Sequence, residues 1–258
     1  MTRRAGASSG SALRANIGSL VHRICAEHMD QWSLPDALAD LEAAWPEIEL
    51  SAEWQRSAEL ADAKMAVQRF DGWLQSRHRQ LIGTEVQVNG TIEVPSGIAR
   101  VRGSIDRLER DAEGACYVVD LKTGVSQTDE TKQSHRLQIG VYQAVVASGG
   151  VEALGTTMVS GAELVHLRIG AGKGHTSPKI EYQSGLVDVP WPDGSGPVDG
   201  CRNWIEASVD KALRIVTSGE YPAVANRGCG HCPARAGCPA LVPMDPATAG
   251  SNQRRNIS

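Results

Sequence analysis

The stretch VRGSIDRLERDAEGACYVVDLKTG, residues 101–124, constrains the fold of this chain more than any other segment. Residues 99–108 and 116–121 have the composition of two strands, and the polar residues 111–114 between them form a turn signal. The second strand is a continuous apolar run of the kind that is buried in a sheet. We therefore expect an antiparallel hairpin that belongs to the core of a sheet.

Three ionisable side chains interrupt this apolar hairpin: Asp106 on the first strand, and Asp120 and Lys122 on the second. Buried charges are costly unless they are paired or bind a cation. Asp120 and Lys122 are two residues apart on a strand and point to the same face, which Asp106 can reach from the neighbouring strand. Two carboxylates beside an ammonium suit Mg²⁺ and the hydrolysis of a phosphodiester. An ordinary salt bridge at a strand end is the alternative.

Composition limits the remaining possibilities. The chain has 258 residues, 41% of them hydrophobic, which is enough for one large domain. A formal net charge of −4 gives no global sign of nucleic-acid binding, although a local groove on an acidic protein can still bind DNA. No apolar run is long enough to span a membrane, and the N-terminus lacks the apolar segment of a secretory signal. We expect a cytoplasmic protein with one domain over residues 12–242 and disordered ends at 1–11 and 243–258.

Hydrophobic periodicity predicts helices on both sides of the strand region. The expected helices are residues 12–31, 35–46, 51–81, 128–148 and 201–218. Two further strands, 162–169 and 180–183, are expected to pair with each other. Residues 85–94 (EVQVNGTIEV) read as a hairpin that turns at Asn89-Gly90, a type I′ signal. Together with the hairpin of residues 99–121 they predict a four-strand antiparallel meander.

Three of the six cysteines lie close together in CGHCPARAGCP: Cys229, Cys232 and Cys238. In a reducing compartment such a cluster is typical of a metal site rather than of a disulfide framework. The C-x2-C pair can hold one metal centre, and the proline after the last cysteine is typical of iron–sulfur binding runs. A zinc site with His231 or another residue as fourth ligand is an equal alternative.

Both kinds of metal centre commonly need a fourth protein ligand. Cys25 and Cys201 are candidates for this ligand, whereas Cys116 is expected to be a small buried residue on its strand. Either metal would attach the C-terminal segment to the core.

Four sequence elements in order resemble the RecB-type branch of the PD-(D/E)XK nuclease superfamily, and most closely the nuclease domains of the helicase–nucleases AddB and AdnA/AdnB. These elements are GSLVH ending in His22, GSIDR with Asp106, VVDLKTG with Asp120 and Lys122, and Q-x3-Y at Gln138 and Tyr142. The resemblance covers roughly residues 22–240. The cysteine run follows where the family places the last three ligands of a [4Fe–4S] cluster.

The resemblance implies an α/β fold with a restriction-endonuclease-like core, in which helices flank a central mixed sheet, followed by a cysteine-rich, metal-bound C-terminal segment. It also implies residue roles. His22, Asp106 and Asp120 would bind Mg²⁺ or Mn²⁺, with the backbone carbonyl of Leu121 as a further ligand. Lys122 would position the attacking water. The two residues of the Q-x3-Y element, Gln138 and Tyr142, would organise the site and contact the DNA strand.

The chain departs from the family pattern in two ways. The family's first cluster cysteine precedes GSLVH, whereas Cys25 follows His22, and no helicase portion is present. The expected function is a Mg²⁺- or Mn²⁺-dependent DNA nuclease that acts on single strands or duplex ends in double-strand break repair. It would be a stand-alone enzyme, a fragment of a helicase–nuclease, or a subunit that works with a separate helicase. A catalytically idle DNA-binding or scaffolding module, stapled by zinc or an iron–sulfur cluster, is the alternative.

Overall fold

A computed structural model describes residues 8–28, 31–48, 53–124, 129–152, 154–172, 176–192, 196–220, 222–225, 229–230, 232–233 and 235–240. The chain divides into two units, Met1–Lys211 and Ala212–Ser258. The disorder expected for residues 1–7 and 243–258 lies outside the described residues, while residues 8–11 already belong to the first helix.

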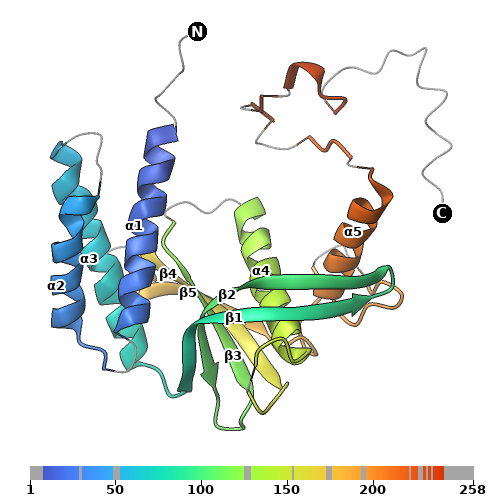
Figure 1. Cartoon of the computed structure of the whole chain (residues 1–258), viewed down its shortest axis with the longest axis horizontal. Coiled ribbons are helices and arrows are strands. Elements are labelled where there is room, and N and C mark those ends of the chain that lie inside the picture. The colour runs from blue at the N-terminus through green and yellow to red at the C-terminus, as the bar shows by residue number, and fades with distance from the viewer. Residues whose placement is uncertain are drawn as a thin grey trace. The chain divides into compact units, whose positions relative to one another are not determined.

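Helices precede, interrupt and follow a single sheet (Figure 1). The elements in chain order are α1 (Ser8–Glu27), α2 (Leu34–Ala44), the 3-10 turn η1 (Trp45–Glu47), α3 (Glu53–Gln75), β1 (Gln80–Val94), β2 (Gly97–Arg110), β3 (Cys116–Lys122), α4 (Asp129–Ala147), β4 (Val159–Gly170), β5 (Pro178–Ser184), α5 (Trp204–Ser218) and η3 (Arg235–Gly237).

The sheet has five strands in the order β1-β2-β3-β4-β5. The β3–β4 pair is parallel and the other neighbours are antiparallel. A parallel neighbour needs a crossover connection, and α4 provides it. The expected mixed sheet flanked by helices is therefore confirmed, as is the pairing of residues 162–169 with 180–183, which lie in β4 and β5.

Two apolar clusters cover the two faces of the sheet. Alternate residues of β3 divide between them: Tyr117 and Val119 pack with α1, α2 and α3, whereas Cys116 and Val118 pack with α4. This division follows from the alternation of side chains along a strand. The result is a sheet between two helical layers, with α1, α2 and α3 side by side in Figure 1.

A buried network of charges joins α3 to the sheet. Glu109 and Glu163 are fully buried. The Nη1 atom of Arg77 lies 2.8 Å from Glu163, and Arg77 also forms an ion pair with Glu109. Arg107 donates to Glu109 over 2.8 Å, and the Trp73 indole donates to Glu163 over 2.9 Å. Each buried carboxylate therefore has a cationic partner, which such a group requires.

The predicted hairpin at residues 85–94 is wrong. These residues belong to one long strand, β1, and the chain turns at Pro95 and Ser96 before β2. Asn89 pairs with Arg102 in the middle of this ribbon. Gly90 serves close packing instead of a turn, because a Cβ atom there would lie 2.9 Å from the Cα of Gly150, just after α4.

The four-strand antiparallel meander is wrong for the same reason, since three strands, not four, precede α4. The helix expected at 51–81 ends at Gln75, and β1 begins at Gln80. The other predicted helices are confirmed with shifts of a few residues at their ends. Cys116 is a buried strand residue, as expected. No helix among the described residues is long and apolar enough to cross a membrane.

Candidate active site

A chain of polar contacts links the end of β3 to α4. The Nζ atom of Lys122 lies 2.7 Å from Oδ2 of Asp120 and donates to Oε1 of Gln138 over 2.8 Å. The amide of Gln138 in turn donates to the Tyr142 hydroxyl over 3.4 Å. Gln138 and Tyr142 are one helical turn apart and so share a face of α4. The ammonium of Lys122 is thereby held in one place by two oxygen atoms.

Asp106 lies where the regular alternation of β2 breaks. Ile105 and Leu108 both pack in the α4-side cluster although they are three residues apart, so the alternation of faces fails between them. At this point Oδ2 of Asp106 accepts the backbone N–H of Leu121 over 2.6 Å. The same oxygen lies 3.6 Å from Nδ1 of His22 on α1. The break thus directs Asp106 toward both β3 and α1.

Gly18 allows α1 to approach the end of β3. A Cβ atom at this position would lie 2.6 Å from the hydroxyl oxygen of Thr123, which directly follows β3. His22 is four residues further along the same helix and therefore lies on the same side of it. The glycine of the GSLVH element consequently sets the position of the histidine that ends it.

Glu85 is a site residue that sequence reasoning missed. Ligand atoms of His22, Glu85 and Asp106 all lie within 4.8 Å of one another, as they would around a metal ion. Ser104 orients Glu85 by donating to its Oε2 over 3.0 Å. The residue has φ +47, a left-handed conformation that costs a residue with a Cβ about 1–3 kcal/mol and is typical of functional sites.

The place of Glu85 at the site follows from the pairing register of β1 with β2. Thr84 pairs with Arg107 and Val86 with Ile105, so Glu85 lies opposite Asp106. With the turn predicted at Asn89-Gly90, Glu85 would instead have paired near Val94, away from Asp106. The misplaced turn therefore concealed this carboxylate.

The electrostatics of these groups show that they share one site. Burial raises the pKa of Asp106 to about 6, opposed by the Leu121 backbone hydrogen bond and reinforced by the charge of Glu85. Burial and the charge of Asp106 also raise the pKa of Asp120, although Lys122 opposes this. Burial lowers the pKa of His22 despite the attraction of Asp120 and Glu85. The imidazole is therefore neutral at pH 7, as a metal ligand must be.

The donor set fits a divalent cation. Oδ2 of Asp120 is buried and makes no hydrogen bond of good geometry with any described residue, although Lys122 is close to it. The Lys122 ammonium, 2.7 Å away, is the partner of this buried carboxylate. Carboxylates with one neutral imidazole suit Mn²⁺ or Mg²⁺. His22, Glu85 and Asp106 are the residues that would hold it, whereas the predicted ligand Asp120 lies outside this group.

Solvent reaches this group through a cavity of about 660 Å³. Its lining includes His22, Glu85 and Asp106, together with Gly18 and Thr123 at the contact between α1 and β3. The cavity is therefore large enough to admit substrate to the carboxylates.

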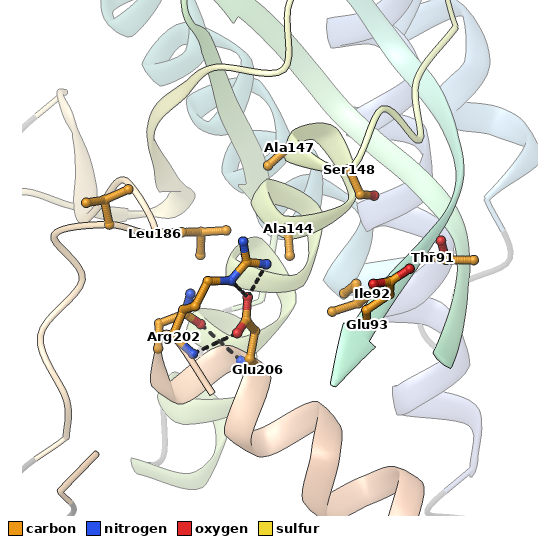
Figure 2. A pocket seen from close by; sticks show the side chains of 11 residues that line it. Thr91, Ile92, Glu93, Ala144, Ala147, Ser148, Leu186, Arg202 and Glu206 are labelled. Carbon is orange, nitrogen blue, oxygen red and sulfur yellow. Dashed lines mark hydrogen bonds and ion pairs between the residues drawn. The ribbon is translucent and has the colours of Figure 1, made fainter. Parts of the chain in front are cut away.

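A second cavity, of about 570 Å³, lies at the other end of α4 (Figure 2). Its charged groups already satisfy one another: the backbone N–H and the Nε of Arg202 both donate to Glu206 over 2.8 Å, as Figure 2 shows. Glu93 on the opposite wall belongs to no group of metal-binding side chains among the described residues. This cavity therefore lacks the chemistry of the first.

The cysteines of the C-terminal unit lie in consecutive short turns. Backbone hydrogen bonds connect Cys232 to Cys229 and Cys238 to Arg235. All six cysteines are thiols rather than disulfide partners. His231 lies outside the described residues. Cys25 is buried in the α1–α3 cluster, where burial raises its pKa, whereas Cys201 is only half-buried.

The comparison with protein families agrees with this site. Residues 1–239 match the family model of the PD-(D/E)XK nuclease superfamily. The chain belongs to this superfamily. Its members hydrolyse phosphodiester bonds and typically use Mg²⁺ or Mn²⁺, which agrees with the donor set described above.

Other comparisons add little to the family assignment. No curated protein matches this chain significantly. Among solved structures, the crystal structure of SSO0001 is similar with a TM-score of 0.40 and 17% sequence identity, over 87% of this chain and 96% of that chain. A TM-score of this size is too low to support a conclusion.

Proposed function

We propose that this chain is a Mg²⁺- or Mn²⁺-dependent DNA nuclease of the RecB-type branch that digests DNA ends during double-strand break repair. The observation that supports this proposal is the grouping of His22, Glu85 and Asp106 within ligand distance of one another. Asp106 joins this group to the end of β3, where Asp120 pairs with Lys122.

Different residues of the chain have different roles in the proposed hydrolysis. His22, Glu85 and Asp106 would hold the metal. Asp120 and the backbone carbonyl of Leu121, whose N–H fixes Asp106, would complete its ligands. A bound divalent ion lowers the pKa of water and neutralises charge on the phosphate. Lys122, fixed by Asp120 and Gln138, directs its third N–H at a phosphate oxygen or at the attacking water.

The role of the α4 residues follows from their contacts. Gln138 accepts from Lys122 and donates to Tyr142, so it fixes the direction of the ammonium. The Tyr142 ring lies against Gly103 of β2, where a Cβ atom would be 3.3 Å away. Gln138 and Tyr142 are therefore positioning residues, and the Tyr142 ring is also a candidate contact for the DNA strand.

A nuclease assay with single-stranded DNA and Mn²⁺ or Mg²⁺ tests the proposal. The wild type should degrade DNA, and Asp120→Ala and Lys122→Ala should lose at least about a hundredfold in rate, since each removes a group that acts on developing charge. Asp62→Asn on α3, an exposed acid paired with Arg168, is the matched control. Equal activity in all variants would reject the assigned site, and an inactive wild type that binds DNA would favour an idle binding module.

We further propose that Cys229, Cys232 and Cys238 bind a [4Fe–4S] cluster. Cys25 and Cys201 are the two candidates for the fourth ligand. Iron, sulfide and zinc analysis of anaerobically purified wild type, Cys201→Ser and Cys25→Ser tests this. One zinc ion and no iron would replace the cluster with a zinc site that uses His231 or another ligand.

The RecB-type resemblance also suggests a helicase as the working partner, since separated strands are the substrate proposed here. Co-purification of the chain with candidate helicases and digestion of duplex DNA with and without ATP would test this association. Equal digestion of duplex DNA by the chain alone would remove the need for a partner.

A further inference from the structure

We propose that the exposed face of the β1–β2 ribbon is a track that guides a single nucleic-acid strand to the metal site. This proposal rests on the proposed nuclease function and adds the path of the substrate. The track consists of Gln87, Asn89 and Thr91 on β1 and of Arg100, Arg102 and Ser104 on β2.

The pairing of the strands places these residues in a row. Gln87 pairs with Ser104, Asn89 with Arg102 and Thr91 with Arg100, and partners in an antiparallel pair project to the same face. No register shift separates them, since the irregularity of this pair lies between Leu81 and Gly83. The row is therefore a continuous ladder of polar side chains.

The ladder begins at the catalytic carboxylates. The amide of Gln87 donates to the Ser104 hydroxyl over 3.3 Å, and that hydroxyl donates to Glu85 over 3.0 Å. Glu85 shares the candidate metal group with Asp106. From this group to the Thr91–Arg100 pair the strands extend about 20 Å at a rise of about 3.3 Å per residue, which corresponds to a few nucleotides of an extended strand.

The opposite face of the ribbon is unavailable to a ligand because α4 covers it. Val88 and Ile92 are buried in the α4-side cluster. A Cβ atom on Gly103 would contact Tyr142 of α4, and one on Gly90 would contact Val145. One face of the ribbon therefore packs on the core, and the other is open over its whole length beyond the catalytic carboxylates, where Figure 1 shows the ribbon extending past the rest of the sheet.

The charge of the open face fits a phosphate backbone. Arg100 and Arg102 are exposed, and their side chains form no hydrogen bond or ion pair with the part of the chain that the structure describes. No carboxylate lies between Glu85 and Glu93 on β1 or between Ile98 and Asp106 on β2. In a chain of net charge −4, this face is a local cationic surface that leads to a cation-binding site.

The geometry favours one strand over a duplex. The two rows of side chains are about 5 Å apart, which matches one backbone. A β-ribbon can enter the major groove of DNA, which is about 12 Å wide, but α4 lies behind this ribbon and prevents the groove from enclosing it. Residues 85–106 contain no aromatic side chain on which bases could stack, so we expect binding that depends on salt and tolerates any base sequence.

Binding of a fluorescent 16-nucleotide poly-dT, in EDTA so that no metal contributes, tests the track. The double variant Arg100→Gln/Arg102→Gln should bind at least about tenfold more weakly at low salt, and its slope of log K against log salt should be shallower by about 1.4, or about 0.7 per lost phosphate contact. Thr91→Lys should bind more tightly and steepen the slope by about 0.7. Lys64→Gln on α3, which removes one charge paired with Glu42, should bind like the wild type.

The outcomes separate the track from the catalytic proposal. Wild-type affinity and slope in the double variant and in Thr91→Lys, with circular dichroism showing that both are folded, would overturn the track. An equal loss for a blunt duplex of the same length would reject the single-strand assignment. Hydrolysis of bis(p-nitrophenyl) phosphate by the wild type with Mn²⁺ reports on the metal site alone, so its absence counts against the nuclease function and leaves the binding result to decide the track.

Discussion

Replacement of Asp106 by Asn should stabilise the metal-free protein while abolishing its response to metal. The folded protein raises the pKa of Asp106 to about 6 from an ordinary value of 3.8. Because the pKa is raised, the folded state binds more protons than the unfolded state between these values, and the free energy of unfolding falls as the pH increases through that range. Above pH 6 the ionised carboxylate therefore destabilises the metal-free fold.

The magnitude follows from the size of this difference. Each unit of the pKa difference changes the free energy of unfolding by about 1.4 kcal/mol. The ionised Asp106 therefore destabilises the metal-free fold by at most about 3 kcal/mol at pH 7. The amide retains the oxygen that accepts the Leu121 N–H over 2.6 Å and removes the repulsion from Glu85 and Asp120. We expect a gain of about 2 kcal/mol, which corresponds to an increase in Tm of about 4–8 °C for a protein of this size.

Thermal unfolding in EDTA and in Mn²⁺, at pH 4.5 and pH 7.5, measures this effect. In EDTA, Asp106→Asn should exceed the wild type in Tm at pH 7.5, and the difference should shrink at pH 4.5. Mn²⁺ should raise the Tm of the wild type and not that of the variant. Asp62→Asn, which changes an exposed acid, should leave both Tm and metal response unchanged. A lower Tm for metal-free Asp106→Asn, or an equal metal response, would refute the reasoning.

Three further predictions concern the support of the site. Gly18→Ala should weaken Mn²⁺ binding about tenfold, measured by calorimetry, because the added Cβ pushes α1 and His22 away from Thr123. The double variant Gly18→Ala/Thr123→Ala should recover much of the affinity, and a lack of recovery would argue against this contact. Arg77→Met should destabilise the fold by about 3 kcal/mol or more in urea unfolding, since it leaves Glu109 and Glu163 buried with fewer partners; an unchanged midpoint would contradict this. Mn²⁺ affinity should fall as the pH decreases below about 6, by up to about tenfold per pH unit for each proton that the metal displaces. The reason is that metal binding requires ionised Asp106 and Asp120, whose pKa values are raised. An affinity that does not change with pH would show that these acids are not ligands.

The sequence alone determined the features that depend on neighbouring residues in the chain. Apolar periodicity located the helices and the buried strand β3, and the spacing of Asp120 and Lys122 placed them on one face. The order of the sequence elements, together with the resemblance to a known family, indicated which residues to consider for the metal. These features need no knowledge of distant contacts, because side-chain direction follows from the local period of a helix or strand.

The tertiary structure decided the register of β1 and therefore the composition of the site. Asn89-Gly90 has the local preference of a turn, but Gly90 packs against Gly150, and the actual turn is held by Asp210 of α5, which accepts the Ser96 N–H over 2.7 Å. Moving the turn changes every cross-strand pair, and this is what places Glu85 opposite Asp106. A contact between residues 114 positions apart produces no periodic pattern in the sequence. Only the folded chain could therefore show that Glu85 lies at the site and that the polar face of the β1–β2 ribbon is exposed beside it.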